Sequence, residues 1–308
     1  MTPTATPRTA LLPSSAGLPW DAASMPGAIR HVLFPSDLSP ASDLALDHAR
    51  FLAVRFGARL TLYHVVEASP SHEDGPSEPG DEAWRRAAER VRGHLDCLAG
   101  RMPAEIDIVV ERGTPAHQAL VAHTLKTRPD LTVMATHGRE GLAHLLAGSV
   151  TETVLQRGRC PVLSVREPEH GVALPYRRIL VPTDLSPASR RAFPLAALLA
   201  RSFESEVLAL HVAQVEAPRS LMGVSHAVEG SPSEAEVAGF LEHDFRGVRV
   251  TPRVLLGSAW GAIVETARAE RVDLIVMSTH GHDSLSDRLI GSHAERVVRH
   301  APCPVLIT

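Results

Sequence analysis

The stretch that decides the fold reads Met134-Ala135-Thr136-His137-Gly138, followed after nine residues by Gly148-Ser149. It comes directly after a short apolar run at residues 131–133, which is typical of a buried parallel strand. Small residues after a strand let the polar atoms of another molecule approach the backbone closely. The Gly-Ser pair stands where a later helix is expected to begin, and the first N–H groups of a helix attract anions. The stretch therefore predicts an anion-binding loop, with phosphate as the expected anion.

The same stretch occurs a second time in the chain. Residues 277–281 read Met-Ser-Thr-His-Gly and are followed after nine residues by Gly291-Ser292. Upstream, residues 31–42 match residues 178–189 at an offset of 147 (184 − 37). Downstream, residues 160–163 match residues 303–306 at an offset of 143 (303 − 160). One structural plan has been used twice, and the first copy carries four extra residues.

Each copy alternates buried strands with amphipathic helices. In the first copy we expect strands at residues 32–34, 60–66, 106–110, 130–133 and 161–165. The first helix is expected to begin at Pro40, with Ser39 as its N-cap, and to end at Gly57. Such alternation implies right-handed crossovers and a parallel doubly wound sheet. Ligands of open α/β sheets bind beyond the carboxyl ends of the strands, where Asp37 closes the first strand and the stretch from Ala135 closes the fourth.

Length and composition narrow the class of protein. A chain of 308 residues suggests about two domains, and 44% apolar residues without a long apolar run indicate a soluble globular protein. The N-terminal residues 1–28 are expected to be a disordered tail without a signal peptide. A net charge of −4 gives no general attraction to nucleic acid or to membranes. Three cysteines without a Cys-x-x-Cys pair fit small packing residues in a reducing cytoplasm.

With this repeat in view, the chain resembles a tandem universal stress protein of the UspA family. The resemblance covers domains at residues 29–166 and 177–308, joined by a linker at residues 167–176. It implies two doubly wound parallel five-stranded sheets of the adenine nucleotide alpha hydrolase-like type, each with strand order 3-2-1-4-5. The two copies would be related by a pseudo-twofold axis, forming an intrachain pseudo-dimer in place of the family's usual homodimer. Further association into a homodimer stays open.

The family's signature for ATP binding is Gly, two residues, Gly, nine residues, then Gly-Ser or Gly-Thr. Both copies keep the second glycine and the Gly-Ser pair. The first glycine is replaced by Ala135 in one copy and by Ser278 in the other. Both replacements are small, but neither has the backbone freedom of glycine, so the departure bears on affinity more than on fold.

The resemblance implies ATP, with or without Mg²⁺, as the bound cofactor. Asp37 would bind the adenosine part, the backbone around Val65 would hold the adenine edge, and the loop with the helix start would meet the phosphates. In the first copy the expected cofactor-binding residues are Pro35, Ser36, Asp37, Val65, Met134, Ala135, His137, Gly138, Gly148, Ser149, Val150 and Thr151. In the second copy they are Pro182, Thr183, Asp184, Val212, Met277, Ser278, His280, Gly281, Gly291 and Ser292.

The function that this resemblance implies is an ATP-binding regulator or nucleotide sensor of a stress response, with an unidentified protein partner. A fast enzyme is not expected, because the sequence has neither a Gly-x-Ser-x-Gly elbow nor a P-loop lysine. Three alternatives stay open: a nucleotide-free scaffold with degenerate sites, a slow ATPase, and, more weakly, a metal-dependent module. Asp37 and Asp184 have the alternative role of capping the following helix. We expect stronger binding in the first copy, because His293-Ala294 replace Val150-Thr151 in the second.

Overall fold

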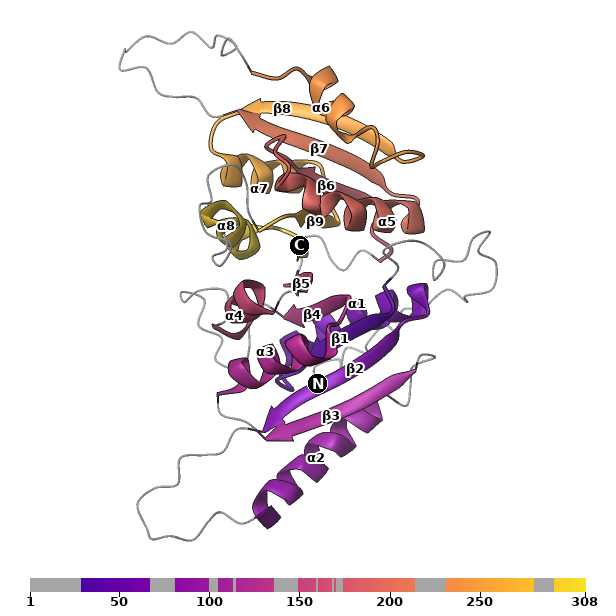
Figure 1. Ribbon diagram of the computed structural model, residues 1–308, viewed down its shortest axis with the longest axis vertical. Coiled ribbons are helices and arrows are strands. Elements are labelled where there is room, and N and C mark those ends of the chain that lie inside the picture. The colour runs from indigo at the N-terminus through magenta and orange to yellow at the C-terminus, as the bar shows by residue number, and fades with distance from the viewer. Residues whose placement is uncertain are drawn as a thin grey trace, which may run out of the picture.

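The computed structural model describes residues 29–66, 81–99, 105–112, 115–135, 149–158, 160–167, 169, 174–213, 231–279 and 291–308. Over these residues the chain forms two α/β halves stacked along the long axis of the molecule (Figure 1). The elements of the first half are β1 (His31–Pro35), α1 (Pro40–Phe56), β2 (Arg59–Val66), α2 (Asp81–Ala99), β3 (Ile106–Arg112), α3 (Ala116–Thr127), β4 (Leu131–Ala135), α4 (Ser149–Arg157) and β5 (Val162–Val165). Those of the second half are β6 (Arg178–Pro182), the 3-10 helix η2 (Ser189–Ala192), α5 (Phe193–Phe203), β7 (Glu206–Ala213), α6 (Glu234–Leu241), β8 (Arg249–Leu256), α7 (Ala259–Ala269), β9 (Leu274–Met277), α8 (Ser292–His300) and β10 (Val305–Ile307).

The ends of α1 are set by local sequence. Ser39 is the N-cap, and its side chain accepts a hydrogen bond from the backbone N–H of Ser42. Pro40 occupies the first helical position, where a missing N–H costs nothing. Gly57 ends the helix in the left-handed conformation, with φ of 60°. The predicted bounds of this helix are confirmed.

The second half departs from the first at the equivalent helix. The chain first makes the 3-10 turn η2, and α5 begins only at Phe193. Pro194 is the physical reason, because it has no N–H and its ring would clash with the carbonyl of Arg190 in a continuous α-helix. The matching position in α1 is Asp47, which has no such restriction.

All ten strands described belong to one sheet, in the order β3-β2-β1-β4-β5-β10-β9-β6-β7-β8. Each half repeats the order 3-2-1-4-5 with parallel neighbours, so the predicted doubly wound fold is confirmed. The halves join where β5 pairs antiparallel with β10, with Ser164 opposite Val305 and Val162 opposite Ile307. An antiparallel pair of equivalent strands has a local twofold axis, which is the expected pseudo-symmetry of the tandem repeat.

The twist of the sheet brings the outer strands of the two halves into similar directions. Although β5 and β10 run in opposite directions, the arrowheads of β2, β3, β7 and β8 all lie toward the same side of the molecule in Figure 1. Neighbouring strands differ by about 20–25° of right-handed twist. Seven neighbour steps separate β2 from β7, so the accumulated rotation is roughly 150° and largely offsets the reversal at the junction.

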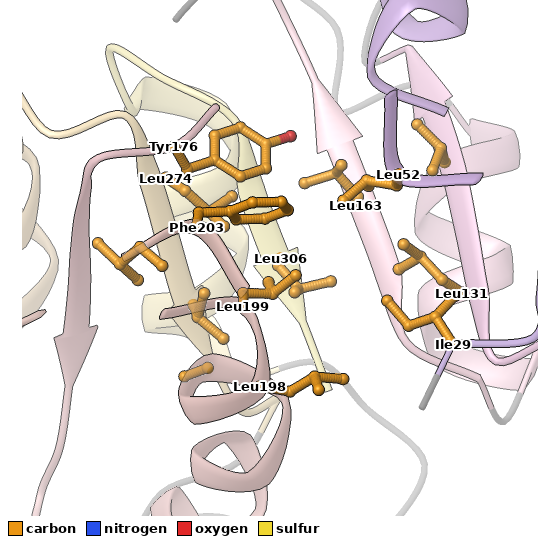
Figure 2. Close-up of a cluster of buried hydrophobic side chains, with 14 of the residues drawn as sticks. Ile29, Leu52, Leu131, Leu163, Tyr176, Leu198, Leu199, Phe203, Leu274 and Leu306 are labelled. Carbon is orange, nitrogen blue, oxygen red and sulfur yellow. The ribbon is translucent and has the colours of Figure 1, made fainter. Parts of the chain in front are cut away.

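One hydrophobic core runs across the junction between the halves. The largest cluster of buried side chains contains Leu52 and Leu163 from the first half together with Leu199, Phe203 and Leu306 from the second (Figure 2). On the opposite face of the sheet each half has a smaller cluster, under α3 and α4 in the first half and under α7 and α8 in the second. The two halves are therefore parts of one packed body.

A buried polar pair also joins the halves. The Nδ1 atom of His48 on α1 lies 2.7 Å from the hydroxyl of Tyr176, two residues before the second half's first strand. The two rings are stacked with their centroids 5.8 Å apart, and both side chains are buried. Burial lowers the pKa of His48 to about 4. The pair holds a neutral imidazole inside the shared core.

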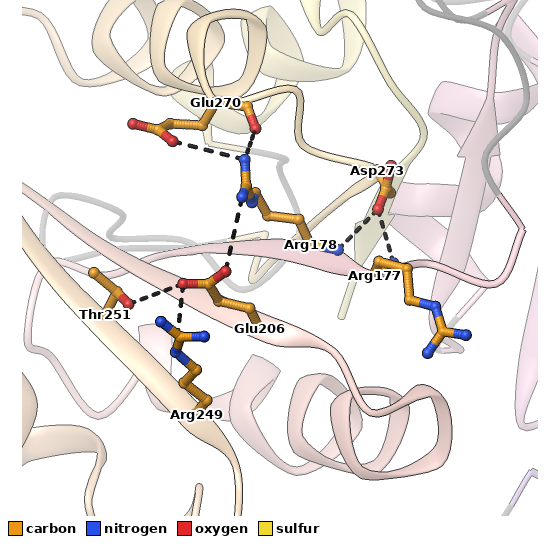
Figure 3. Close-up of polar contacts among 7 residues, drawn as sticks. All are labelled: Arg177, Arg178, Glu206, Arg249, Thr251, Glu270 and Asp273. Atoms are coloured by element: carbon orange, nitrogen blue, oxygen red, sulfur yellow. Dashed lines mark hydrogen bonds and ion pairs between the residues drawn. The ribbon is translucent and has the colours of Figure 1, made fainter.

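The amino ends of the strands are tied by a repeated aspartate. Asp130 accepts hydrogen bonds from the backbone N–H groups of Arg30 and His31, each at 2.9 Å. Its counterpart Asp273 accepts from the N–H groups of residues 177 and 178, at 2.7 and 2.8 Å (Figure 3). In the second half the side chain of Arg178 also reaches Glu206 and Glu270, each at 3.8 Å (Figure 3). These contacts lie at the opposite end of the strands from the candidate site.

Candidate functional site

The carboxyl end of β1 is held by its neighbour β2. The N–H of Ser36 donates to the carbonyl of Tyr63 at 2.9 Å, and the Nδ1 of His64 lies 2.6 Å from the carbonyl of Ser36. A carbonyl only accepts, so Nδ1 carries the hydrogen. The second half repeats the arrangement, with His211 Nδ1 3.0 Å from the carbonyl of Thr183. Both strand histidines therefore anchor the turn after the first strand of their half.

That turn has an uncommon backbone in both halves. Leu38 and Leu185 have φ values of 61° and 60°, a left-handed conformation that is an outlier for a bulky residue. In the first half the Leu38 N–H donates to the hydroxyl oxygen of Ser36 at 3.0 Å. In the second the Leu185 N–H donates to the hydroxyl oxygen of Thr183 at 3.0 Å. Side-chain hydrogen bonds of this kind hold a conformation that the residue itself disfavours, and such conformations gather at functional sites.

The aspartates of the turn support the start of the following helix. Oδ1 of Asp37 accepts from the N–H of Ser39 at 3.0 Å and from the hydroxyl of Ser42 at 2.5 Å. Oδ1 of Asp184 accepts from the N–H of Ser186 at 3.0 Å. In the first half the N-cap itself is Ser39, so Asp37 orients the cap residue from two positions before it. Neither aspartate is itself the N-cap, but Asp37 supports the cap of α1 and Asp184 makes the matching contact three residues before η2.

The end of β4 meets the first turn of α4. Met134 is buried, and the hydroxyl of Thr151 donates to the carbonyl of Ala135 at 3.3 Å. Val65 at the end of β2 and Val150 in α4 pack against the same hydrophobic cluster. Strand ends and helix start therefore converge on one side of the sheet in the first half.

The second half makes this junction differently. Ala294 occupies the place of Thr151 and has no hydroxyl. In this half the N–H of Gly291 donates to the carbonyl of Thr279 at 2.8 Å. A Cβ on Gly291 would lie 2.9 Å from that carbonyl oxygen, so the close approach requires glycine here. The sequence comparison of the two copies indicated the missing hydroxyl but not this contact.

The structure places all the predicted residues that it describes at the carboxyl ends of the strands or next to them. Pro35, Ser36, Asp37, Val65, Met134, Ala135, Ser149, Val150 and Thr151 lie on the carboxyl ends of β1, β2 and β4 or in the first turn of α4. Pro182, Thr183, Asp184, Val212, Met277, Ser278, Gly291 and Ser292 lie on the matching elements β6, β7, β9 and α8 or next to them. His137, Gly138, Gly148, His280 and Gly281 fall outside the described residues.

Sequence reasoning missed a polar cluster beside the first site. The hydroxyl of Tyr63 donates to Oε2 of Glu111 at 2.9 Å, and Nδ1 of His123 lies 3.1 Å from Oε1 of the same residue. These residues come from β2, β3 and α3. A difference between the two copies could have indicated this cluster, because Leu210 stands where the first copy has Tyr63.

Other candidate chemistries find little support among the described residues. Within those ranges no three His, Cys, Asp or Glu side chains are grouped as a metal site would need. No helix in the described part is both long and apolar enough to span a bilayer. The three cysteines are free thiols, and burial raises the pKa of both Cys160 and Cys303. A raised pKa disfavours the reactive thiolate, in keeping with the packing role expected for these two residues.

The fold and the paired strand ends define a tandem doubly wound α/β protein, and comparison with known proteins agrees. The family model described as the universal stress protein family matches residues 28–166 and again residues 175–308. The chain belongs to the universal stress protein family.

Relatives and solved structures resemble either one half of the chain or nearly all of it. A universal stress protein of Methanocaldococcus jannaschii is 36% identical over 140 residues, which are 43% of this chain and 81% of that protein. One of Mycobacterium tuberculosis is 27% identical over 261 residues, or 80% of this chain and 86% of that protein. A crystal structure of a universal stress protein from Archaeoglobus fulgidus covers 90% of this chain and 97% of its own, with a TM-score of 0.68 at 19% identity. The tandem arrangement is thus shared with known members of the family.

Proposed function

We propose that this protein is an ATP-binding regulator of a stress response, in which nucleotide occupancy biases its conformation or its choice of protein partner. Membership of the universal stress protein family supports the role in stress. The observation that carries the nucleotide proposal is the convergence of β1, β4 and the first turn of α4 on one edge, around the anion-loop sequence. We further propose that the protein acts in the cytoplasm, in keeping with its free cysteines.

The first half is proposed as the stronger site. The hydroxyl of Thr151 donates to the carbonyl of Ala135 and so fixes the first turn of α4, where phosphate oxygens are expected, against the end of β4. In the second half Ala294 cannot make this contact. Asp287 also replaces His144 within the second loop sequence, and an added negative charge disfavours phosphate.

The energetic demand shows which contacts must matter. A dissociation constant of 1 μM corresponds to about 8 kcal/mol of binding free energy. The charge interaction at a helix end contributes about 0.3–1 kcal/mol, and at most ~2 kcal/mol in partly buried sites. Burial of the base and several hydrogen bonds from loop N–H groups must therefore supply most of the affinity.

The test is thermal unfolding of the metal-free full chain with and without millimolar ATP. At a concentration of 100 times its dissociation constant, ATP should stabilise the fold by about 2.7 kcal/mol. Gly138→Arg places a long side chain in the first predicted loop, and Gly281→Arg is its matched control in the second. We expect the stabilisation to be lost in the first variant and kept in the control.

A nucleotide-free scaffold is the second candidate, and one observation favours it. Asp37 accepts from the N–H of Ser39, the N-cap of α1, and Asp184 accepts from the N–H of Ser186 in the matching turn, so both carboxylates have a structural reason without any ligand. A wild-type protein that shows no shift with ATP, with or without Mg²⁺, would refute the nucleotide proposal and leave the scaffold.

A further inference from the structure

Glu111 is a carboxylate held in one orientation and still open to solvent. Tyr63 donates to one of its oxygens at 2.9 Å, and His123 Nδ1 lies 3.1 Å from the other. Because a carboxylate oxygen only accepts, Nδ1 must carry a hydrogen. Desolvation, reinforced by the bond to Glu111, raises the pKa of Tyr63, so the phenol stays a donor. The Glu111 side chain nevertheless remains 37% exposed, and each of its oxygens accepts one hydrogen bond from the residues that the structure describes, out of about two that each can accept.

The position of Glu111 follows from strand register. On the parallel strands β2 and β3, Val65 pairs with Glu111 and Tyr63 pairs with Val109. Paired residues face the same side of a sheet, and Val65 shares its cluster with Val150 of α4. Glu111 therefore lies on the same side as the first turn of α4.

Strand order sets these groups in a row. The strands lie side by side in the order β3, β2, β1 and β4. Glu111 is on β3, Val65 is at the end of β2, and α4 begins beyond the end of β4, so the end of β1 lies between Val65 and the start of α4. Two strand spacings, about 10 Å, separate β1 from β3. A nucleotide with its phosphates at α4 and its sugar near Asp37 would direct the far edge of its base toward Glu111.

The second half has no such carboxylate. Leu255 pairs with Val212 as Glu111 pairs with Val65, and it is 39% exposed. Leu210 and Thr266 occupy the positions that match Tyr63 and His123. The same fold is thus built without the cluster, so packing alone does not require it.

We propose that Glu111 is a specificity-determining residue of the first site, which accepts a hydrogen bond from an amino group on the far edge of a purine base. Tyr63 and His123 act as positioning residues. The inference rests on the proposed nucleotide-binding function. A 6-aminopurine presents a donor to the carboxylate, whereas a 6-oxopurine presents oxygen lone pairs and is repelled.

The experiment is calorimetric titration of the full chain with ATP and with inosine triphosphate, which carries a 6-oxo group. We expect the wild type to prefer ATP by about 10- to 100-fold, the range that a hydrogen bond to a charged group supplies. Glu111→Gln should lower this ratio at least about 10-fold, because its amide N–H₂ can donate to the oxo group while its carbonyl still accepts from Tyr63. Leu255→Gln is the matched control and should leave the ratio unchanged.

The outcomes separate this inference from the function on which it rests. Nucleotide binding in the wild type with an unchanged ratio in Glu111→Gln overturns the specificity role and leaves the proposed function. An equal loss of both nucleotides also overturns it, since a purely structural cluster would act on both alike. No binding to the wild type overturns the proposed function and this inference together. If Glu111→Gln does not fold, Glu111→Asp is the second variant, which keeps the charge but moves it back by the length of one methylene. The preference for ATP over inosine triphosphate should then be smaller than in the wild type.

Discussion

Acidification should destabilise this protein through one buried histidine. His48 is enclosed between the two halves, and burial lowers its pKa from 6.5 to about 4. In the unfolded chain the pKa returns to about 6.5. Between these values the unfolded state binds more protons than the folded state, so stability falls as pH decreases through this window. A difference of roughly 2.5 pKa units corresponds to about 3 kcal/mol lost between pH 7 and pH 4.

The assay is urea unfolding at several pH values from 7 to 4, followed by circular dichroism. His48→Gln keeps a hydrogen-bonding group beside Tyr176 but cannot take up a proton, so its stability should fall by about 3 kcal/mol less than that of the wild type. The carboxylates titrate equally in both proteins and cancel in the difference. His243→Gln is the control, because that side chain is 77% exposed and should follow the wild type. Parallel pH curves for wild type and His48→Gln would refute the reasoning.

Two further substitutions test close contacts in the fold. Gly291→Ala should destabilise the protein by about 1–3 kcal/mol in thermal unfolding, because the added Cβ would press on the carbonyl of Thr279. Gly239→Ala in α6 is the control, because the added Cβ meets open space there and should stabilise the protein by about 0.5–1 kcal/mol. Asp130→Ala and Asp273→Ala each leave two backbone N–H groups without their acceptor, and denaturant titration should show similar losses of about 1–3 kcal/mol in the two variants. A loss confined to one of the two aspartate variants would show that the repeated contact is not equivalent in the two halves.

The fold could be predicted because its signals are local and occur twice. Ser39, Pro40 and Gly57 fix the ends of α1 through capping and backbone conformation, which the sequence displays directly. The delayed start of α5 follows from Pro194, although the repeat around this residue favours a helix as continuous as α1. The pairing of β5 with β10 has no comparable signal, because register between distant edge strands depends on how the two halves dock.

The site was predictable where main-chain geometry decides it. The turn after β1 and the start of α4 follow from strand ends and helix caps, and the structure has them where the motifs indicated. The cluster around Glu111 was not predictable from any one residue, since Tyr63 and His123 each fit an ordinary buried face. Only their meeting in space fixes the orientation of the carboxylate, and that meeting depends on the packing of α3 on the sheet.

The antiparallel seam between β5 and β10 determines how assembly of the two halves depends on protein concentration. A homodimer joined at such a seam falls apart on dilution, and its folded population then depends on protomer concentration. Here the two partners are covalently linked, so their association is intramolecular and one copy per cell is as fully assembled as a thousand. The pairing of the two halves is therefore independent of how much of the protein has been made.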